Sequence, residues 1–548
     1  MLPSTPWVAL GVSSVLVGSI AQARPLNSQQ SAQMPFWFQP DKYKSSHPMD
    51  IHNQIDPLTH LSAISPFFLP EQAVASLPEN CNLTRAALLV RHSAILANDE
   101  EWDETMKPFV DKLKKIPKSE FPQDKSHPWH FLNTWKSHIS RKDLEVLSDR
   151  GKDDSYAFGK MIRSAYGSLF PPVIKKKSSS SSSSRKSTRV SYKVWSASSA
   201  RDIDTSKSYI RGAFPTIQSG PDGTGDGEQV ELIEVPNHEK SWERSLTPHK
   251  ACDAFEKESS KKPAETWLAV YAAKTRARLS DDRLLGEKLA GRFVDMDILA
   301  MQMLCGYQTI GQGDSPLCKV FTDEEWLAVE YYFDIRYHYM IGYGNSLSPY
   351  LGRPWVRTAA HLLAGEESHL TAEADSVYIT SPRSLSTSNL KRPKTRPLPI
   401  PKLPPNETHT QLLHPFFTHR ESPGFASVFL NLYNRTEAQG GIGQSAGIDP
   451  PLDRIPEDRQ WMTSHLVPFL GHIALEQFEY IPPKGTDAND LVKKKEKFVR
   501  CVVNGKVEIM GGCQDGIEES CKWETFINWV DERAARWGTW EEVCKAKA

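Results

Sequence analysis

The sequence predicts an α/β fold in which a mixed or parallel sheet is flanked by helices and a mostly α-helical lobe is inserted. Short apolar segments typical of buried strands, such as residues 85–90 ("RAALLV"), precede segments with helical periodicity. The same order recurs on both sides of a long central region, residues 247–363, whose pattern is helical throughout. With 548 residues, 39% of them hydrophobic, the chain can bury a large core, and we expect two lobes.

The overall charge of the chain is balanced. Lys and Arg number 66 against 67 Asp and Glu, which gives a formal net charge of -1. A nucleic-acid-binding protein usually carries a clear basic excess, so we expect no nucleic-acid partner. Any charge that matters for function must therefore be concentrated locally.

The first 23 residues resemble a secretory signal peptide. An apolar stretch, Trp7–Ile20, is followed by the small-x-small pattern Ala21-Gln22-Ala23, although a positively charged start is missing. The alternative is an uncleaved membrane anchor, but the stretch is short for a bilayer span, and no later stretch is long and apolar enough. We therefore expect no stable membrane insertion.

Two further features agree with export. Three sequons offer glycosylation sites at Asn82, Asn406 and Asn434. The eight cysteines form an even set, which suits disulfide pairing in an oxidising compartment. The sequence thus predicts a secreted or cell-surface protein, while its oligomeric state stays open.

Read in order, the chain divides into an arm, two α/β segments and the helical lobe. Polar, Pro-rich residues 24–79 predict an extended arm, after which residues 80–246 and 364–548 form the α/β lobe around the helical lobe of residues 247–363. Within these segments we expect strands in residues 85–90, 190–198, 227–235 and 412–418, and helices in 200–214, 265–279, 295–310 and 323–344. A basic Ser-rich loop (175–189) and a Pro-rich excursion (376–408) interrupt the α/β lobe.

Two places where a strand gives way to a helix each present a histidine. The strand beginning at residue 85 ends at Arg91 and His92, after which Asn98 or Asp99 can cap a helix. The later strand ends at His419, and Ser422 is placed to cap the following helix, with a proline in its first turn. Strand ends that feed helix N-termini are where anions bind in open α/β sheets, so both histidines are candidate site residues.

These motifs resemble the histidine acid phosphatase family, the two-lobed branch that includes fungal phytases. The resemblance rests on Arg91-His92 after a strand, on His419 followed closely by an acid, and on the segments "LCGYQTI" and "DEEWLAVEYYFDIRYHYMIGYGN" of the helical lobe, and it runs from about residue 80 to the end. It implies a phosphomonoester substrate, His92 as the nucleophile that forms a phosphohistidine, and Arg91 and His419 as ligands of the phosphoryl oxygens. It implies no cofactor, and no Cys or His spacing suggests a metal site.

The proton donor is assigned by a variant of the family motif. Many relatives have His-Asp, whereas this chain has His419-Arg420-Glu421, which resembles the His-x-Glu variant of the inositol polyphosphate phosphatase branch. The resemblance therefore implies Glu421 as the donor. The alternative is that Glu421 is only a favourable charge in the first turn of a helix.

Two expected arginines are replaced by neutral residues. The family has arginines where this chain has Ile95 and Trp195, and losing one preorganised donor commonly costs about a hundredfold to a thousandfold in rate. Arg420 is the candidate phosphate ligand that compensates, with Lys193 and Arg201 as further candidates; Arg201 is better explained as a structural residue that holds a carboxylate.

The same resemblance implies three disulfides: Cys252–Cys544, Cys305–Cys318 and Cys513–Cys521. Cys81 and Cys501 remain, and their pairing follows only by elimination. Three hypotheses of function stay open: a secreted acid phosphatase acting on phosphomonoesters, possibly of the phytate kind; a relative without activity that binds phosphate-bearing ligands; and a structural cell-surface protein that keeps only the scaffold.

Overall fold

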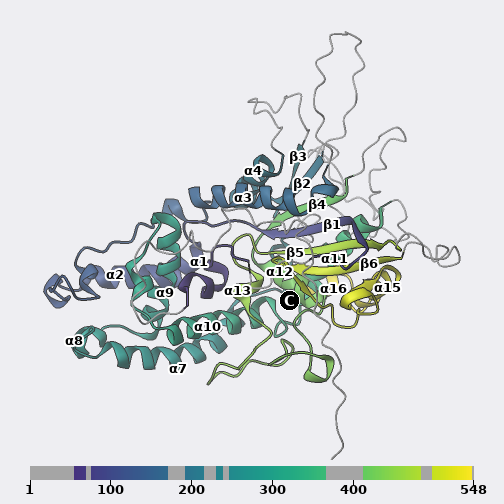
Figure 1. Cartoon of the computed structure of the whole chain (residues 1–548). Helices are drawn as coiled ribbons and strands as arrows, with labels where there is room; N and C mark the ends of the chain where they lie inside the picture. Colours follow the sequence, from purple (N-terminus) through teal and green to yellow (C-terminus); the bar gives the residue numbers. More distant parts are fainter. Residues whose placement is uncertain are drawn as a thin grey trace, which may run out of the picture.

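The computed structural model describes residues 55–69, 76–170, 192–214, 230–237, 246–365, 411–482 and 496–545. It has the predicted architecture, a mixed sheet flanked by helices together with a mostly helical lobe (Figure 1). The expected signal peptide, the Ser-rich loop, the Pro-rich excursion and Asn406 lie outside the described residues. Among the described residues, no helix combines the length and apolar character that crossing a bilayer requires.

One eight-stranded sheet forms the centre of the α/β lobe. Its order is β3-β2-β4-β1-β5-β6-β7, with β8 also paired to β6. The strands are β1 (Cys81–Arg91), β2 (Tyr192–Ala197), β3 (Val230–Val235), β4 (Leu413–Thr418), β5 (His472–Tyr480), β6 (Lys497–Val503), β7 (Lys506–Glu508) and β8 (Cys521–Lys522). The pairs among β3, β2, β4 and β1 are parallel, whereas β5 to β8 pair in antiparallel fashion. The carboxyl ends of β1, β2 and β4 therefore meet at one edge.

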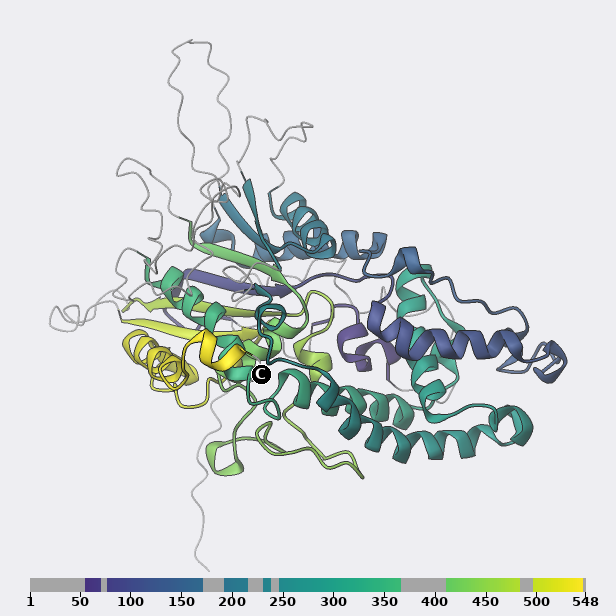
Figure 2. The same cartoon turned by 180° about the vertical axis from the view of Figure 1, so that it is seen from behind.

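Helices cover both faces of this sheet, so the side chains of β1 are buried on either side. Ala86, Leu88 and Val90 pack in the core shared with α3 (Asp149–Ala165) and α4 (Ala200–Ala213), because alternate residues of a strand face the same side. Ala87 and Leu89 face the opposite core, which includes α11 (Ser348–Ala364) and α12 (Glu421–Phe429). Figure 2 shows α3 and α4 on the other side of the sheet from α15 (Trp523–Ala534) and α16 (Trp540–Cys544).

The helical lobe is built around α7, α9 and α10. These helices span Lys261–Leu279, Asp295–Gln312 and Asp323–Ile341, and they contact one another. Shorter helices complete the set: α1 (Asp99–Glu101), a π-helical turn η5 (Trp102–Met106), α2 (Lys107–Lys115), α6 (Pro248–Ala251), α8 (Gly286–Ala290) and α13 (Thr463–Leu466). The segment of η5 and α2 packs on α9, whereas α11 packs on α12 and β1 of the α/β lobe.

The helix after the first histidine begins as the sequence predicts. The Asn98 side chain accepts a hydrogen bond from the backbone N–H of Glu101, and Trp102, Met106 and Phe109 are buried on one face. The prediction for the second helix is wrong in detail: α12 begins at Glu421, one residue before Ser422. The Ser422 hydroxyl instead donates to the carbonyl of Leu246, so it ties α12 to the segment before α6.

The prediction of an extended arm is wrong for residues 57–64. This segment forms two 3-10 turns, η3 (Pro57–His60) and η4 (Ser62–Ile64), and Leu61 and Ile64 are fully buried. Gly306 of α9 makes this possible, because a Cβ there would lie 2.6 Å from Ile64 Cγ2 and 2.8 Å from Leu61 Cδ1. Tertiary contacts therefore order a segment whose local sequence has little periodicity.

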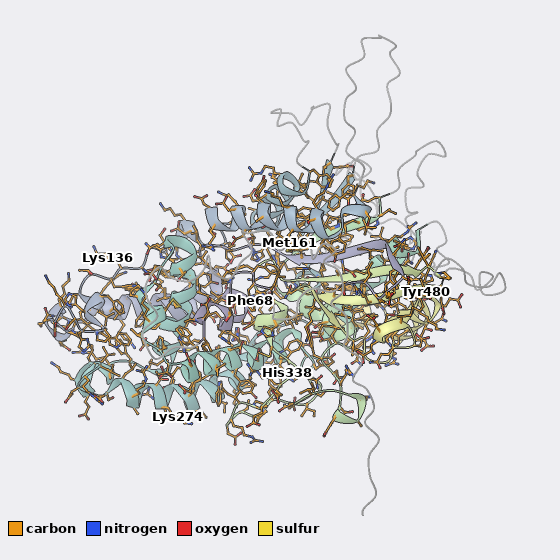
Figure 3. The ribbon with its side chains drawn as sticks, in the orientation of Figure 1. Phe68, Lys136, Met161, Lys274, His338 and Tyr480 are labelled. Carbon is orange, nitrogen blue, oxygen red and sulfur yellow. A yellow bond between two sulfur atoms is a disulfide. The ribbon has the colours of Figure 1, made fainter. Side chains whose placement is uncertain are left out.

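The three disulfides implied by the family resemblance are confirmed, whereas the pair Cys81–Cys501 is wrong. Cys252–Cys544, Cys305–Cys318 and Cys513–Cys521 are bonded, while Cys81 and Cys501 are free thiols. In the sheet, Cys81 lies opposite Tyr480, at the end of β5 away from the helical lobe (Figure 3).

Cys501 lies at a different level of the same sheet. It pairs with Leu475 of β5, which in turn lies opposite Ala87 of β1. The two cysteines are therefore five residues of β5 apart along the sheet, from Tyr480 to Leu475, or about 17 Å, and β5 also lies between their strands. A disulfide requires Cα atoms within about 7 Å, so the register excludes this bond.

We expect the purified protein to contain two free thiols. Alkylation of the unfolded, unreduced chain, followed by peptide mass spectrometry, should find the label on Cys81 and Cys501 and on no other cysteine, since the other six are bonded. In the folded protein Cys501 should react far more slowly, because it is fully buried. Absence of label on both residues would contradict the register described here.

Two predicted glycosylation sites lie within the described residues and differ in surroundings. Asn82 is exposed. Asn434 is half-buried, and its amide nitrogen, which would carry a glycan, donates a hydrogen bond to Asn431 Oδ1 at 2.9 Å. Asn82 is therefore the more accessible acceptor of the two.

Candidate active site

The two predicted strand ends meet at one cavity. Because β1 and β4 are parallel neighbours, Arg91 pairs in register with Thr418, so both histidines follow the same edge of the sheet. The ring centroids of His92 and His419 lie 6.3 Å apart. The cavity beside them has a volume of about 540 Å³, and its lining includes all five predicted site residues: Arg91, His92, His419, Arg420 and Glu421.

His92 is held in the orientation that a nucleophile needs. Its Nδ1 lies 2.9 Å from the carbonyl oxygen of Ser93, a position in which Nδ1 carries the proton and donates. The neutral ring then has an unprotonated Nε2. Burial, together with the positive charges of Arg201 and Arg91, keeps the pKa of His92 well below its ordinary value of 6.5, so Nε2 keeps its lone pair.

Arg91 is fixed by the backbone around it. One terminal nitrogen, Nη1, donates to the carbonyls of Ala63 and Val467 at 2.5 and 2.7 Å, and the guanidinium lies 4.3 Å from the centre of the Phe469 ring. Within the described part of the chain, its Nε has no hydrogen-bond partner. Arg91 therefore places a buried, firmly held cation at the cavity wall.

His419 is positioned from the far side of the cavity by α4. Its Nε2 lies 3.0 Å from Asp202 Oδ2 and 3.0 Å from the hydroxyl of Ser199. Burial lowers the pKa of His419, while the carboxylate of Asp202 opposes this shift. The histidine is therefore oriented by a buried acid, which can stabilise its protonated form when an anion binds.

Glu421 is buried among positive groups. Its Oε1 lies 3.3 Å from Lys257 Nζ and 3.8 Å from Arg420 Nε, and its Oε2 lies 3.9 Å from His249 Nε2. Burial raises the pKa of this carboxyl, but the charges of Lys257 and Arg420 outweigh it and hold the pKa well below 4.5. In the protein without phosphate, these charges favour the ionised carboxylate of Glu421.

The two neutral residues at the expected arginine positions belong to the scaffold. Ile95 lines the cavity but is nearly fully buried, and its backbone bridges to Leu147. Trp195 stacks on Phe416 of the neighbouring strand, with ring centroids 4.8 Å apart. The Ile95 side chain has no hydrogen-bond donor, and Trp195 is not among the residues that line the cavity.

The candidates for compensation differ in how they are held. Arg420 donates to Glu101 Oε1 at 2.5 Å and lines the cavity. Arg201 also lines it and, as predicted, holds a carboxylate, since it forms an ion pair with Glu145. Lys193 is not among the lining residues, so its candidacy fails.

Sequence analysis missed a group of lining residues on the segment that enters the helical lobe. His249, Lys250 and Lys257 lie about 170 residues before the second histidine, and no local motif marks them. They reach the cavity because the hydroxyls of Thr418 and Ser422 both donate to the carbonyl of Leu246, which fastens this segment to the strand end. Together with His419 and Glu421, His249 forms a group of buried side chains that could hold a metal ion.

This arrangement can bind a phosphoryl group and offers a nucleophile to it. A neutral imidazole nitrogen, a buried arginine, a second histidine backed by an acid and a carboxyl group converge on one cavity at the end of the parallel strands. Such a set of groups suits an anionic ligand.

The comparisons with known proteins agree with this description. The family model of the histidine phosphatase superfamily (branch 2) matches residues 103–504, and the chain belongs to this family. The match begins after Arg91 and His92. Phytase A of Aspergillus oryzae is 24% identical over 472 residues, which cover 84% of this chain and 86% of that one. An acid phosphatase of Schizosaccharomyces pombe is 23% identical over 324 residues, 57% of this chain and 63% of its own.

Solved structures support the fold. The phytase from D. castellii superposes with a TM-score of 0.64 at 18% identity and covers 89% of this chain and 87% of its own. The multiple inositol polyphosphate phosphatase of Bifidobacterium longum, solved with phosphate, gives a TM-score of 0.53 at 9% identity. The match covers 87% of this chain and 98% of that protein. At these identities the likeness concerns the fold alone.

Proposed function

We propose that this protein hydrolyses phosphomonoesters through a phosphohistidine on His92. The observation that carries the proposal is the His92 ring, whose Nδ1 faces the Ser93 carbonyl and whose Nε2 is left unprotonated in a cavity that Arg91 also lines. Nε2 attacks phosphorus, the nitrogen–phosphorus bond forms, and the ester bond to the leaving oxygen breaks. Arg91, His419 and Arg420 bind the phosphoryl oxygens and offset the charge that develops on them.

Glu421 supplies and then accepts a proton. It protonates the departing alkoxide, and its carboxylate afterwards removes a proton from the water that attacks the phosphohistidine and releases phosphate. Because Glu421 is ionised in the free protein, it must gain a proton when substrate binds. The negative charge of a bound phosphate opposes that of Lys257 and Arg420, which favours the protonated carboxyl.

A second candidate is a protein that binds phosphate-bearing ligands without turning them over. It is favoured by the neutral side chains of Ile95 and Trp195, which remove two donors from the phosphate site. Hydrolysis of p-nitrophenyl phosphate between acidic and neutral pH separates the two candidates. Turnover by the parent protein supports the enzyme, and ligand binding without turnover supports the binding protein.

Both candidates predict that phosphate or vanadate stabilises the folded protein. A ligand that binds only the folded state at a hundred times its Kd adds about 2.7 kcal/mol to the free energy of unfolding. Differential scanning calorimetry should therefore show a higher Tm with millimolar phosphate than with chloride at equal ionic strength. An unchanged Tm would contradict both candidates and leave a structural role for the scaffold.

We expect Arg420→Ala to lower kcat/KM by about a hundredfold, since Arg420 supplies positive charge that Ile95 and Trp195 do not. The measurement is steady-state kinetics with p-nitrophenyl phosphate. Arg141→Ala is the matched control, because Arg141 also pairs with a carboxylate, Asp103, but is 74% exposed at the surface. If Arg420→Ala keeps the parental rate, the compensating role passes to Arg201 or Lys250, which line the same cavity.

We also propose that the chain is exported. The proposal is supported by three disulfides and by the exposed sequon asparagine Asn82. Expression of the full sequence with a fungal secretory host, followed by N-terminal sequencing of the protein from the medium, tests it. A mature start near residue 24 is the expected result, and retention of the whole chain inside the cells would contradict it.

A further inference from the structure

Three buried side chains at the inner end of the cavity form a compact set of donors. One ring nitrogen from His249, one from His419 and a carboxylate oxygen of Glu421 lie within 4.8 Å of one another. His249 belongs to α6, whereas the other two residues flank the start of α12. The set is therefore assembled by tertiary structure from segments about 170 residues apart, which explains why sequence spacing gave no sign of a metal site.

Within this set, His249 and Glu421 do not hydrogen-bond each other. The 3.9 Å between His249 Nε2 and Glu421 Oε2 is too long for a hydrogen bond. Within the described residues, His249 Nδ1 has no hydrogen-bond partner, although the residue is only 7% exposed. Among the described residues, the buried Nδ1 therefore has no partner that explains its burial, and Nε2 faces Glu421 at a distance that leaves room for a ligand between them.

The ring of His249 is nevertheless held in place. It lies 5.7 Å from the Phe255 ring and 6.0 Å from the Phe425 ring, centroid to centroid, which keeps it facing the other two groups. The two carboxylate oxygens of Glu421 have different neighbours. Oε1 lies near Lys257 and Arg420, whereas Oε2 faces His249. A metal ion bound to Oε2 would therefore leave the ion pair between Oε1 and Lys257 in place.

Two imidazoles and a carboxylate are a ligand set that zinc takes in proteins, with bonds of about 2.0–2.2 Å. Ligand atoms on one tetrahedral ion are then roughly 3.4 Å apart, so the three groups would have to close by on the order of 1 Å. Asp202, 3.0 Å from His419 Nε2, adds a second carboxylate that offsets the charge of a divalent ion. The neighbouring cations Lys250, Lys257, Arg201 and Arg420 oppose binding, which favours a moderate affinity.

We propose that His249, His419 and Glu421 bind one divalent transition-metal ion, with zinc as the representative ion, and that this ion excludes phosphate from the cavity. The exclusion rests on the proposed function, in which His419 binds the phosphoryl group and Glu421 moves the proton. Metal binding itself does not depend on that function. The site is thus an inhibitory metal site at the inner end of the substrate cavity.

Equilibrium dialysis of the full chain tests the metal site without any assay of activity. The protein is freed of metal with EDTA and dialysed against zinc chloride in a phosphate-free buffer. We expect one zinc bound per chain, with moderate affinity, and a higher Tm than in EDTA. His249→Gln should weaken zinc binding at least about tenfold, because even supporting residues of a metal site are worth that much.

His138→Gln is the matched control. His138 is also partly buried, and its Nε2 likewise has no hydrogen-bond partner among the described residues, but it does not line the cavity. This variant should bind zinc as the parent does. If neither the parent nor the control binds zinc, or if His249→Gln binds it with parental affinity, the proposal is wrong.

The competition with phosphate is tested on the parent protein, so it does not depend on the folding of a variant. Excess inorganic phosphate, at zinc concentrations below the solubility limit of zinc phosphate, should release the bound zinc into the dialysate. Zinc should also raise the apparent KM for p-nitrophenyl phosphate, and EDTA should restore it. Bound zinc that leaves KM unchanged or raises the rate would overturn the inhibitory role. A parent that binds zinc but hydrolyses no ester would contradict the proposed function and not the metal site.

Discussion

His92→Ala should abolish the hydrolysis of phosphomonoesters. We expect kcat/KM to fall by at least about ten-thousandfold, because the substitution removes the attacking nitrogen. His419, whose ring centroid is 6.3 Å from that of His92, is engaged through Nε2 with Asp202 and Ser199. Initial rates with p-nitrophenyl phosphate, at enzyme concentrations high enough to follow a slow residual reaction, measure the loss.

A covalent intermediate gives this experiment a second readout. After the parent protein is mixed with a radiolabelled phosphomonoester and quenched in alkali, in which phosphohistidine persists, peptide mapping should find the label on the peptide that contains His92. His92→Ala should carry none. His138→Ala serves as the control because this histidine lies outside the cavity, and it should keep both label and rate. Parental turnover by His92→Ala would exclude the phosphohistidine route.

Glu421→Gln should reveal its role through the leaving group. For an alkyl phosphate, whose alkoxide needs a proton to depart, we expect a loss of about a hundredfold to ten-thousandfold in kcat/KM. For p-nitrophenyl phosphate, whose leaving group is stable as an anion, the loss should be much smaller. Equal losses for the two substrates would mean that Glu421 supports binding and does not donate the proton.

The pH dependence of the same reaction follows from the ion pair between Glu421 and Lys257. Lys257 helps to hold the pKa of Glu421 below 4.5, and the donor must be protonated to act, so activity falls as pH rises through the pKa of Glu421 in the complex. Lys257→Met removes a positive charge 3.3 Å from the carboxylate, which raises that pKa. The alkaline limb of kcat, which reports the enzyme–substrate complex, should therefore move to higher pH. A limb that stays in place or moves to lower pH would show that another group sets it.

Lys261→Met is the matched control for that shift. Lys261 also belongs to the start of the helical lobe and pairs with carboxylates, Glu104 and Glu258, but it has no contact with Glu421. The pH profile of this variant should match that of the parent. A shift in both variants would point to a general change in the charge of the lobe.

The sequence by itself was enough for the order of strands and helices near the two histidines. The apolar run before Arg91, the Asn98 cap and the buried face that begins at Trp102 are local features, and local features set where a strand ends and a helix begins. The confirmed disulfides followed from the family resemblance. The cavity lining contains all five residues that the sequence pointed to, since both histidines follow parallel strands that are neighbours in the sheet.

Tertiary structure decided what lies around those residues. The register of β1, β5 and β6 keeps Cys81 and Cys501 apart, although counting cysteines had left them as a pair. Ser422 bonds the carbonyl of Leu246 and not its own helix. Sequence pattern cannot supply these contacts, because each joins segments that are distant along the chain and whose separation in space depends on how the whole sheet is assembled.

The protonation of Glu421 shows the same division most clearly. Burial alone disfavours a charged carboxylate and would favour the protonated acid. The folded chain brings Lys257 to 3.3 Å from one oxygen and His249 to 3.9 Å from the other. The local motif after His419 was therefore enough to choose the candidate acid. Its charge depends on Lys257 and His249, which are distant along the chain, because electrostatic energy depends on distance in space and not on separation in sequence.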